Sequence, residues 1–124
     1  MNEQVISLMN IHEVSFVEKL NPDTGKTRKT CIGGAFANFL DDTINVAHLQ
    51  DMLNDLDNYI LNSGTIDDLN DILQSQDAFS AFLDQTEVKI YGDLPNDEDL
   101  ILQTIPIQDF KVLLQAWRDY LQSI

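Results

Sequence analysis

Basic residues are scarce in this sequence: seven Lys and Arg stand against 21 Asp and Glu in 124 residues, which gives a net charge of −14. The stretch Thr30–Val88 has no Lys or Arg at all, yet it carries ten Asp and one Glu. Nucleic acid and anionic membranes are polyanions, so this charge makes both of them poor partners. The charge predicts instead a cationic partner.

Cysteine is limited to Cys31, and no run of residues approaches 18 apolar positions. A single cysteine excludes an intrachain disulfide and favours a reducing compartment. The first residues lack the basic and apolar regions of a signal peptide, and no stretch is long enough to span a membrane. We therefore expect a cytoplasmic protein that does not associate with membranes.

Histidine is limited to His12 and His48, which restricts the chemistry available. Neither has a second histidine four residues away, and no cysteine pair has zinc-site spacing. The Asp-containing loops do not supply the ligand register of a calcium-binding loop, and Gly33-Gly34 is not followed by a phosphate-binding motif. We expect no catalytic residues, no metal and no cofactor. The alternative is an enzyme or small-molecule binder that uses Cys31 with His12 or His48.

Apolar residues make up 44% of the sequence, which is sufficient for the core of one domain spanning residues 1–124. Val5–Leu20 reads as one or two strands, and the turn sequence Asn21–Gly25 joins it to a strand at Lys26–Ile32. Near the other end, strands are predicted at Glu87–Tyr91 and Leu100–Ile105. These pairs predict antiparallel hairpins near both ends of the chain.

Between and after the hairpins, apolar residues recur at the three and four spacing of helices. In Ile44–Leu61 this stripe follows a predicted N-cap at Asp42 or Thr43. Ala35–Leu40 fits a strand or a short helix, and we favour the helix. Further helices are predicted after a cap at Thr65, at Ala78–Leu83, and from Ile107 or Gln108. The helix after Thr65 is expected to bury Ile66, Leu69, Ile72 and Leu73 and to turn its Asp residues outward. We therefore expect an α+β fold in which the hairpins pack on three to four helices.

The acidic residues of the helical region fall on faces away from the apolar stripes. Asp is preferred to Glu there although Glu is the better helix former, so solubility alone does not explain the choice. Short carboxylates at fixed spacing suit the capture of fixed cations such as Arg. We therefore predict a surface that binds a basic protein. Its predicted contact residues come from two helices and one loop: Asp51, Asp55, Asn58, Asp67, Asp68, Asp71, Asp97, Glu98 and Asp99.

The last 38 residues have a recognisable order. A strand from Glu87 leads through an acidic loop to a second strand that ends in Ile105-Pro106, and a closing helix follows with Trp117 near its middle and Tyr120-Leu121 after it. This order resembles the immunity proteins of bacterial contact-dependent inhibition and related polymorphic-toxin systems.

The resemblance implies a small acidic cytoplasmic protein that binds and neutralises the C-terminal toxin domain of a secreted effector, often a basic nuclease. Because an apolar Trp is more often part of a core, Trp117 is not assigned to the interface. A mimic of nucleic acid that inhibits a DNA- or RNA-binding host protein is the alternative within the binding class.

Overall fold

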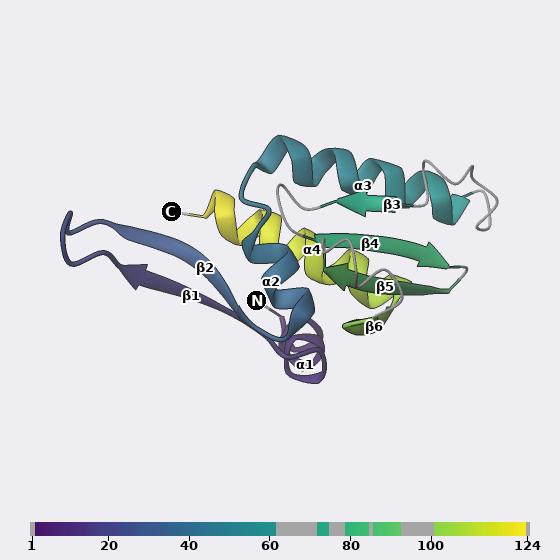
Figure 1. The fold of residues 1–124 in the computed structure, drawn as a ribbon, viewed down its shortest axis with the longest axis horizontal. Coiled ribbons are helices and arrows are strands. Elements are labelled where there is room, and N and C mark those ends of the chain that lie inside the picture. The colour runs from purple at the N-terminus through teal and green to yellow at the C-terminus, as the bar shows by residue number, and fades with distance from the viewer. Residues whose placement is uncertain (1, 62–71, 75–78, 85, 93–100, 124) are drawn as a thin grey trace.

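The computed structural model of the chain describes residues 2–61, 72–74, 79–84, 86–92 and 101–123. Its elements are, in order, α1 (Glu3–Ile11), β1 (Val14–Leu20), β2 (Thr27–Gly33), α2 (Ala35–Asp41), α3 (Val46–Leu61), β3 (Ile72–Gln74), β4 (Phe79–Asp84), β5 (Glu87–Gly92), β6 (Gln103–Pro106) and α4 (Ile107–Gln122) (Figure 1). Strands β1 and β2 form one antiparallel sheet, and β3 to β6 form a second one in sequential order. The predicted α+β class, with hairpins near both ends packed on helices, is confirmed.

The N-terminal segment is a helix, so the prediction of strand from Val5 onward is wrong in its first half. The side chain of Asn2 caps this helix, because its Oδ1 accepts a hydrogen bond of 2.9 Å from the backbone N–H of Val5. Met9 is buried and Leu8 packs against the core, whereas the rest of α1 is largely exposed. The extended backbone starts only at Val14, after Glu13 has taken a positive φ of 57°.

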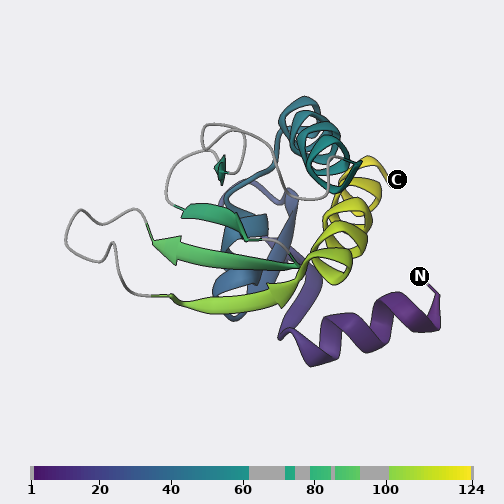
Figure 2. The ribbon, with the colours of Figure 1, turned by 90° about the vertical axis from the view of Figure 1, so that its right-hand side faces the viewer.

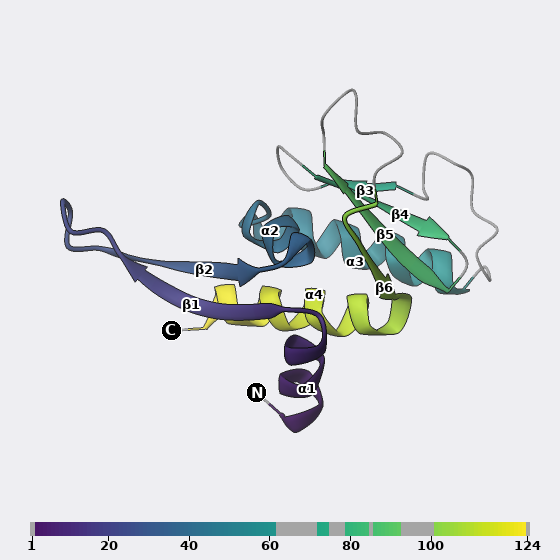
Figure 3. The ribbon, with the colours of Figure 1, turned by 60° about the horizontal axis from the view of Figure 1, so that its bottom comes forward.

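The hairpin of β1 and β2 projects away from the four-stranded sheet (Figure 3). Its turn uses the predicted chemistry: Gly25 has a φ of +70° and donates its N–H to the carbonyl of Asn21 at 2.8 Å. At the base of the hairpin, Phe16 lies against α4, with its ring centroid 5.2 Å from those of Trp117 and Tyr120. The base is therefore part of the core, while the turn end extends beyond it.

Gly33 closes the base of the hairpin, where β2 passes the start of β1. Its φ is +140°, and a Cβ atom built there would lie 1.8 Å from the carbonyl oxygen of Glu13. That oxygen accepts a hydrogen bond of 2.9 Å from the N–H of Gly34. A side chain at position 33 is therefore excluded both by backbone conformation and by space.

The core lies between the four-stranded sheet and the helices α2, α3 and α4. Helices α3 and α4 run side by side (Figure 2), and the apolar stripe predicted for each is buried, except that Ile60 and Leu121 are only partly covered. The rings of Phe36 and Phe110 stack with centroids 5.0 Å apart, which joins α2 to α4. None of the described helices combines the length and apolarity that crossing a membrane requires.

The acidic middle of the chain contains more strand than the sequence predicts. The helix predicted at Ala78–Leu83 is strand β4, in which Ala81 and Leu83 are buried and Phe82 and Asp84 are exposed. This period of two is the pattern of a half-buried strand. The helix predicted to run to Leu73 is also wrong at its end, because β3 begins at Ile72. Residues 62–71 lie outside the described residues.

The start of α3 also differs from the prediction. Asn45 supplies the cap, since its Oδ1 accepts a hydrogen bond of 3.2 Å from the N–H of His48. Asp42 instead ends α2, and Thr43 is buried with its hydroxyl donating to the carbonyl of Phe39 at 3.0 Å. The short helix predicted at Ala35–Leu40 is confirmed as α2.

Replacing Trp117 by Phe is expected to lower the free energy of unfolding by about 2 to 3 kcal/mol. Trp117 is fully buried, and its Nε1 donates a hydrogen bond of 2.8 Å to the carbonyl of Thr43, which would lose its donor. Urea unfolding followed by circular dichroism measures the change. Tyr91→Phe, at a half-buried ring, is the control and is expected to stay within about 0.5 kcal/mol of the parent. Equal midpoints for the two variants would contradict the role of this bond.

Candidate functional site

An exposed acidic face runs along α3. Asp51, Asp55 and Asn58 follow the i, i+4, i+7 spacing of one helix face, and all three are exposed. The opposite side of α3 is buried in the core through Leu49, Met52, Leu53, Leu56 and Tyr59. We call Asp51, Asp55 and Asn58 the α3 acidic face. Their predicted location on a single exposed face is confirmed; their role in binding stays a prediction.

Two cations of α4 reach α3, and both are already paired with carboxylates. Lys111 of α4 reaches across to Asp57 of α3, with Nζ and Oδ1 2.6 Å apart. Arg118 of α4 donates to Oε1 of Gln50 on α3 at 3.0 Å and pairs with Asp119 on its own helix at 3.1 Å. Among the described residues, no cation forms an ion pair with Asp51 or Asp55. These two carboxylates are therefore available to cations of a partner.

Six of the predicted contact residues lie outside the residues that the structure describes: Asp67, Asp68, Asp71, Asp97, Glu98 and Asp99. The structure thus brings together the first group of predicted contacts and leaves the other two groups untested.

A basic surface of opposite sign lies on the β1–β2 hairpin. Four of the seven Lys and Arg residues are there: Lys19, Lys26, Arg28 and Lys29. We call this group the basic hairpin. The strand register places Lys19 directly opposite Arg28, and like charges in that arrangement repel. Sequence reading locates basic residues in this loop region, but the register that brings two of them opposite each other comes only from the structure.

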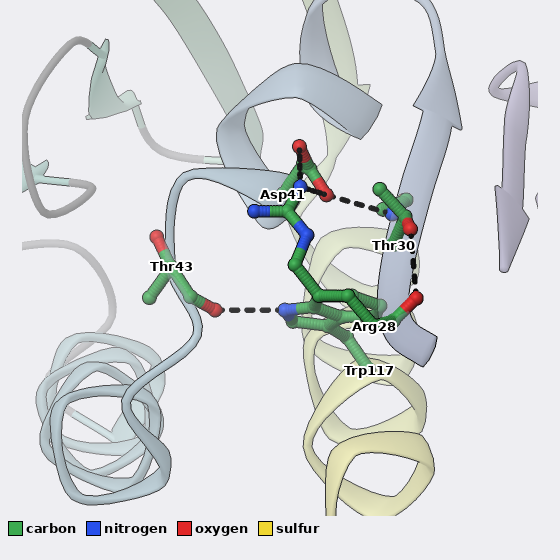
Figure 4. A network of polar contacts seen from close by, with 6 residues as sticks. Arg28, Thr30, Asp41, Thr43 and Trp117 are labelled. Atoms are coloured by element: carbon green, nitrogen blue, oxygen red, sulfur yellow. Dashed lines mark hydrogen bonds and ion pairs between the residues drawn. The ribbon is translucent and has the colours of Figure 1, made fainter. Parts of the chain in front are cut away.

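Two members of the basic hairpin are tied to the rest of the protein. The guanidinium of Arg28 lies 3.3 Å from a carboxylate oxygen of Asp41, although 61% of the Arg28 side chain stays exposed (Figure 4). The ammonium of Lys29 lies over the ring of Tyr120, 5.4 Å from its centroid, and donates to the hydroxyl of Ser123 at 3.0 Å. In the part of the chain that the structure describes, Lys19 and Lys26 form no ion pair.

Cys31 does not have the surroundings of a nucleophile. Its side chain is only 2% exposed, and burial, followed by the negative charge of Asp41, raises the pKa of the thiol to about 12. The thiolate, which is the reactive form, is therefore almost absent at neutral pH. Asp41 also fixes the backbone here, because its Oδ1 accepts a hydrogen bond of 2.9 Å from the N–H of Cys31.

The side chain of His12 is engaged by a carboxylate of α4. The Nε2 atom of His12 lies 2.9 Å from Oδ2 of Asp109, which joins the end of α1 to the first turn of α4. The side-chain amide of Gln103 donates to the carbonyl of His12 at 3.0 Å and accepts from the N–H of Phe36 at 2.8 Å. His12 thus lies in a network that connects α1, α2, β6 and α4, which is a structural use of the residue.

A groove of about 520 Å³ lies between α1 and α4. Most of the residues that line it have small apolar or uncharged polar side chains. The lining residues are Asn2, Gln4, Val5, Val112, Gln115, Ala116, Asp119, Tyr120 and Ser123. Two polar residues of this lining already have partners: the hydroxyl of Ser123 donates to the carbonyl of Tyr120 at 2.6 Å, and Asp119 accepts from Arg118 at 3.1 Å. Within the described ranges, no group of three or more His, Cys, Asp and Glu side chains is arranged to hold a metal ion.

The chain was compared with protein-family models, with curated proteins and with solved structures. None of the three comparisons found a match.

Proposed function

We propose that the protein is an immunity protein, which binds the toxin domain of a secreted effector in the cytoplasm and neutralises it. The observation that supports this best is the α3 acidic face, where Asp51 and Asp55 stand one helical turn apart on an exposed surface and form no ion pair with any described cation. The net charge of −14 attracts a cationic partner over longer distances as well. A non-enzymatic role agrees with the protonated thiol of Cys31.

The chemistry of the partner follows from these carboxylates. A nuclease domain presents Lys and Arg to the phosphates of its substrate, and an acidic surface can cover those side chains. Arg binds carboxylates through two parallel hydrogen bonds, and its geometry suits rigid, closely spaced acceptors. Binding would deny the substrate access to the same cations. The protein would therefore act by occupying a basic surface of the toxin rather than by chemistry.

The α3 acidic face also bears on the alternative of a nucleic-acid mimic. A mimic needs carboxylates spread at phosphate spacing along an extended surface. Of the described residues, Asp51 and Asp55 form one compact pair, and Asp57 is neutralised by Lys111. The compact arrangement favours a local contact with a protein.

The first expected result concerns the rate of binding. The partner to use is the toxin domain of the effector encoded next to this protein's gene. Its association with the protein is expected to slow by about tenfold as ionic strength rises from low to physiological, because screening weakens electrostatic steering. Stopped-flow fluorescence with purified proteins measures the rate. A rate that does not change with salt would overturn the electrostatic mechanism, and absence of a complex would overturn the proposed function.

The face is tested by changing its two carboxylates together. Asp51→Asn with Asp55→Asn is expected to slow association roughly threefold and to flatten its salt dependence, since charges near an interface act mainly on the association rate. Glu3→Gln with Glu87→Gln removes the same charge from exposed positions on α1 and β5 and serves as the control. If both double variants slow association equally, the association rate depends on the net charge of the protein and not on the α3 acidic face.

A further inference from the structure

The outer edge of β1 presents a row of backbone groups that the fold leaves unused. In an antiparallel pair, residues alternate between those bonded to the partner strand and those whose N–H and C=O point away. The N–H of Cys31 bonds to Asp41 rather than to β1, so Cys31 and its register partner Phe16 form an outward-pointing pair. By the same alternation, Glu18 and Leu20 direct their N–H and C=O groups outward from β1.

Two further hydrogen bonds fix this alternation independently. The N–H of Gly34 donates to the carbonyl of Glu13 at 2.9 Å, and the N–H of Asn21 donates to the carbonyl of Lys26 at 2.8 Å. Both bonds involve odd-numbered residues that flank β1, one at each end, and the alternation between them leaves the even-numbered positions of β1 facing outward. Among the described residues, none donates to or accepts from these outward groups, and β1 pairs only with β2.

The side chains along this edge define the charge of what it can bind. Lys19 is exposed, stands opposite Arg28, and forms no ion pair with a described residue. Lys26 is exposed beside the turn, and Leu20 is 63% exposed. Glu18 is also exposed, and the register places this carboxylate opposite Lys29. A protein with a net charge of −14 gains no solubility from two facing cations, which repel each other. An acidic residue brought alongside Lys19 would remove that repulsion.

We infer that the outer edge of β1 is a second binding surface, which takes up an extended acidic segment of a protein partner as a third strand of the hairpin sheet. Backbone hydrogen bonds to Phe16, Glu18 and Leu20 would hold the segment. Its carboxylates would lie beside Lys19 and Lys26, and its apolar side chains beside Leu20. This mode of recognition combines affinity from the backbone with selection by side chains.

This surface goes beyond the proposed function and does not depend on it. The α3 acidic face selects cations and the edge of β1 selects carboxylates, so the two would hold different parts of a partner. A protein segment fits the edge better than a nucleic acid does, because only a peptide backbone can continue the ladder of outward N–H and C=O groups.

The test uses a blocked peptide of alternating Glu and Val, titrated into the isotopically labelled protein and followed by NMR. The amides of Phe16, Glu18 and Leu20 are expected to shift, whereas a matched peptide of alternating Lys and Val leaves them unchanged. Lys19→Gln with Lys26→Gln is expected to weaken binding roughly fivefold, because exposed ion pairs contribute little individually. Lys89→Gln, far from the edge, is the control.

A pair of variants at Glu18 separates backbone pairing from charge. Glu18→Pro removes the outward N–H while leaving the ladder to β2, as proline does on edge strands, and is expected to weaken binding about tenfold or more. Glu18→Gln removes the same negative charge and keeps the N–H, so binding is expected to stay equal or to tighten.

Four results would overturn the inference. The first is equal binding by the two Glu18 variants, both confirmed as folded by their amide spectra. The second is tighter binding of an oligonucleotide that has the charge of the Glu peptide, which would identify a nucleic-acid surface. The third is dimerisation in sedimentation experiments through the same amides, which would identify a second copy as the occupant. The fourth is a hairpin whose amides respond to none of the probes.

Discussion

Gly33→Ala is expected to lower the free energy of unfolding by about 3 to 5 kcal/mol, through backbone strain and overpacking together. The alanine Cβ would meet the carbonyl oxygen of Glu13 at 1.8 Å, which is far inside van der Waals contact. Relief would require the start of β1 to separate from the end of β2. The hydrogen bond from the N–H of Gly34 to that carbonyl would then be lost as well.

Gly25→Ala provides the matched control for this variant. Gly25 also has a positive φ, +70°, but nothing lies within 4 Å of the position that a Cβ would take. Its expected cost is therefore conformational only, about 1 kcal/mol. Chemical unfolding of both variants gives the comparison. Equal costs would show that the close approach of Glu13 does not constrain the hairpin.

The thiol of Cys31 is expected to react with a maleimide or iodoacetamide on the order of 1000-fold more slowly in the folded protein than in the unfolded chain, near pH 8. Its pKa is raised from 9.0 to about 12 by burial and by Asp41, so each unit of the shift lowers the thiolate fraction about tenfold. The measurement is the rate of mass addition in native buffer and in concentrated guanidinium chloride.

Asn10→Cys in a Cys31→Ser background is the control, because position 10 is exposed and should be labelled quickly in the folded state. Native labelling of Cys31 within tenfold of the unfolded rate would contradict the raised pKa and would restore a nucleophilic thiol to consideration. The sign for stability follows from the same shift. The folded thiol keeps its proton between about pH 9 and 12 while the unfolded thiol loses it, so this group's contribution to stability falls as pH rises through that range.

Local sequence signals predict the elements that depend on neighbouring residues. The turn residues from Asn21 to Gly25 and the apolar stripes of α3 and α4 correctly locate one hairpin and two long helices. The errors fall where tertiary packing decides. The segment of α1 is short and has few buried residues, so its weak periodicity does not distinguish a helix from a strand. In β4, Phe79 and Phe82 resemble a helical pair until their neighbours across the sheet are known.

The candidate site also has features that the sequence predicts and features that only the fold reveals. Helical spacing alone places Asp51, Asp55 and Asn58 on one exposed face. It does not reveal that Lys111, more than fifty positions later in the chain, neutralises Asp57. The unused edge of β1 is likewise absent from any sequence pattern, because it depends on which strands pair and in which register.

The last element of the fold holds together the first ones, which has a consequence for synthesis on the ribosome. Helix α4 supplies Asp109 to His12, 97 positions earlier, and Trp117 to Thr43, 74 positions earlier. Contacts of such sequence separation form only after long loops have closed. During translation, the growing polypeptide would therefore keep the apolar side of α2 and α3 uncovered until α4 leaves the exit tunnel, and chaperones that bind nascent chains would have their longest access to those helices.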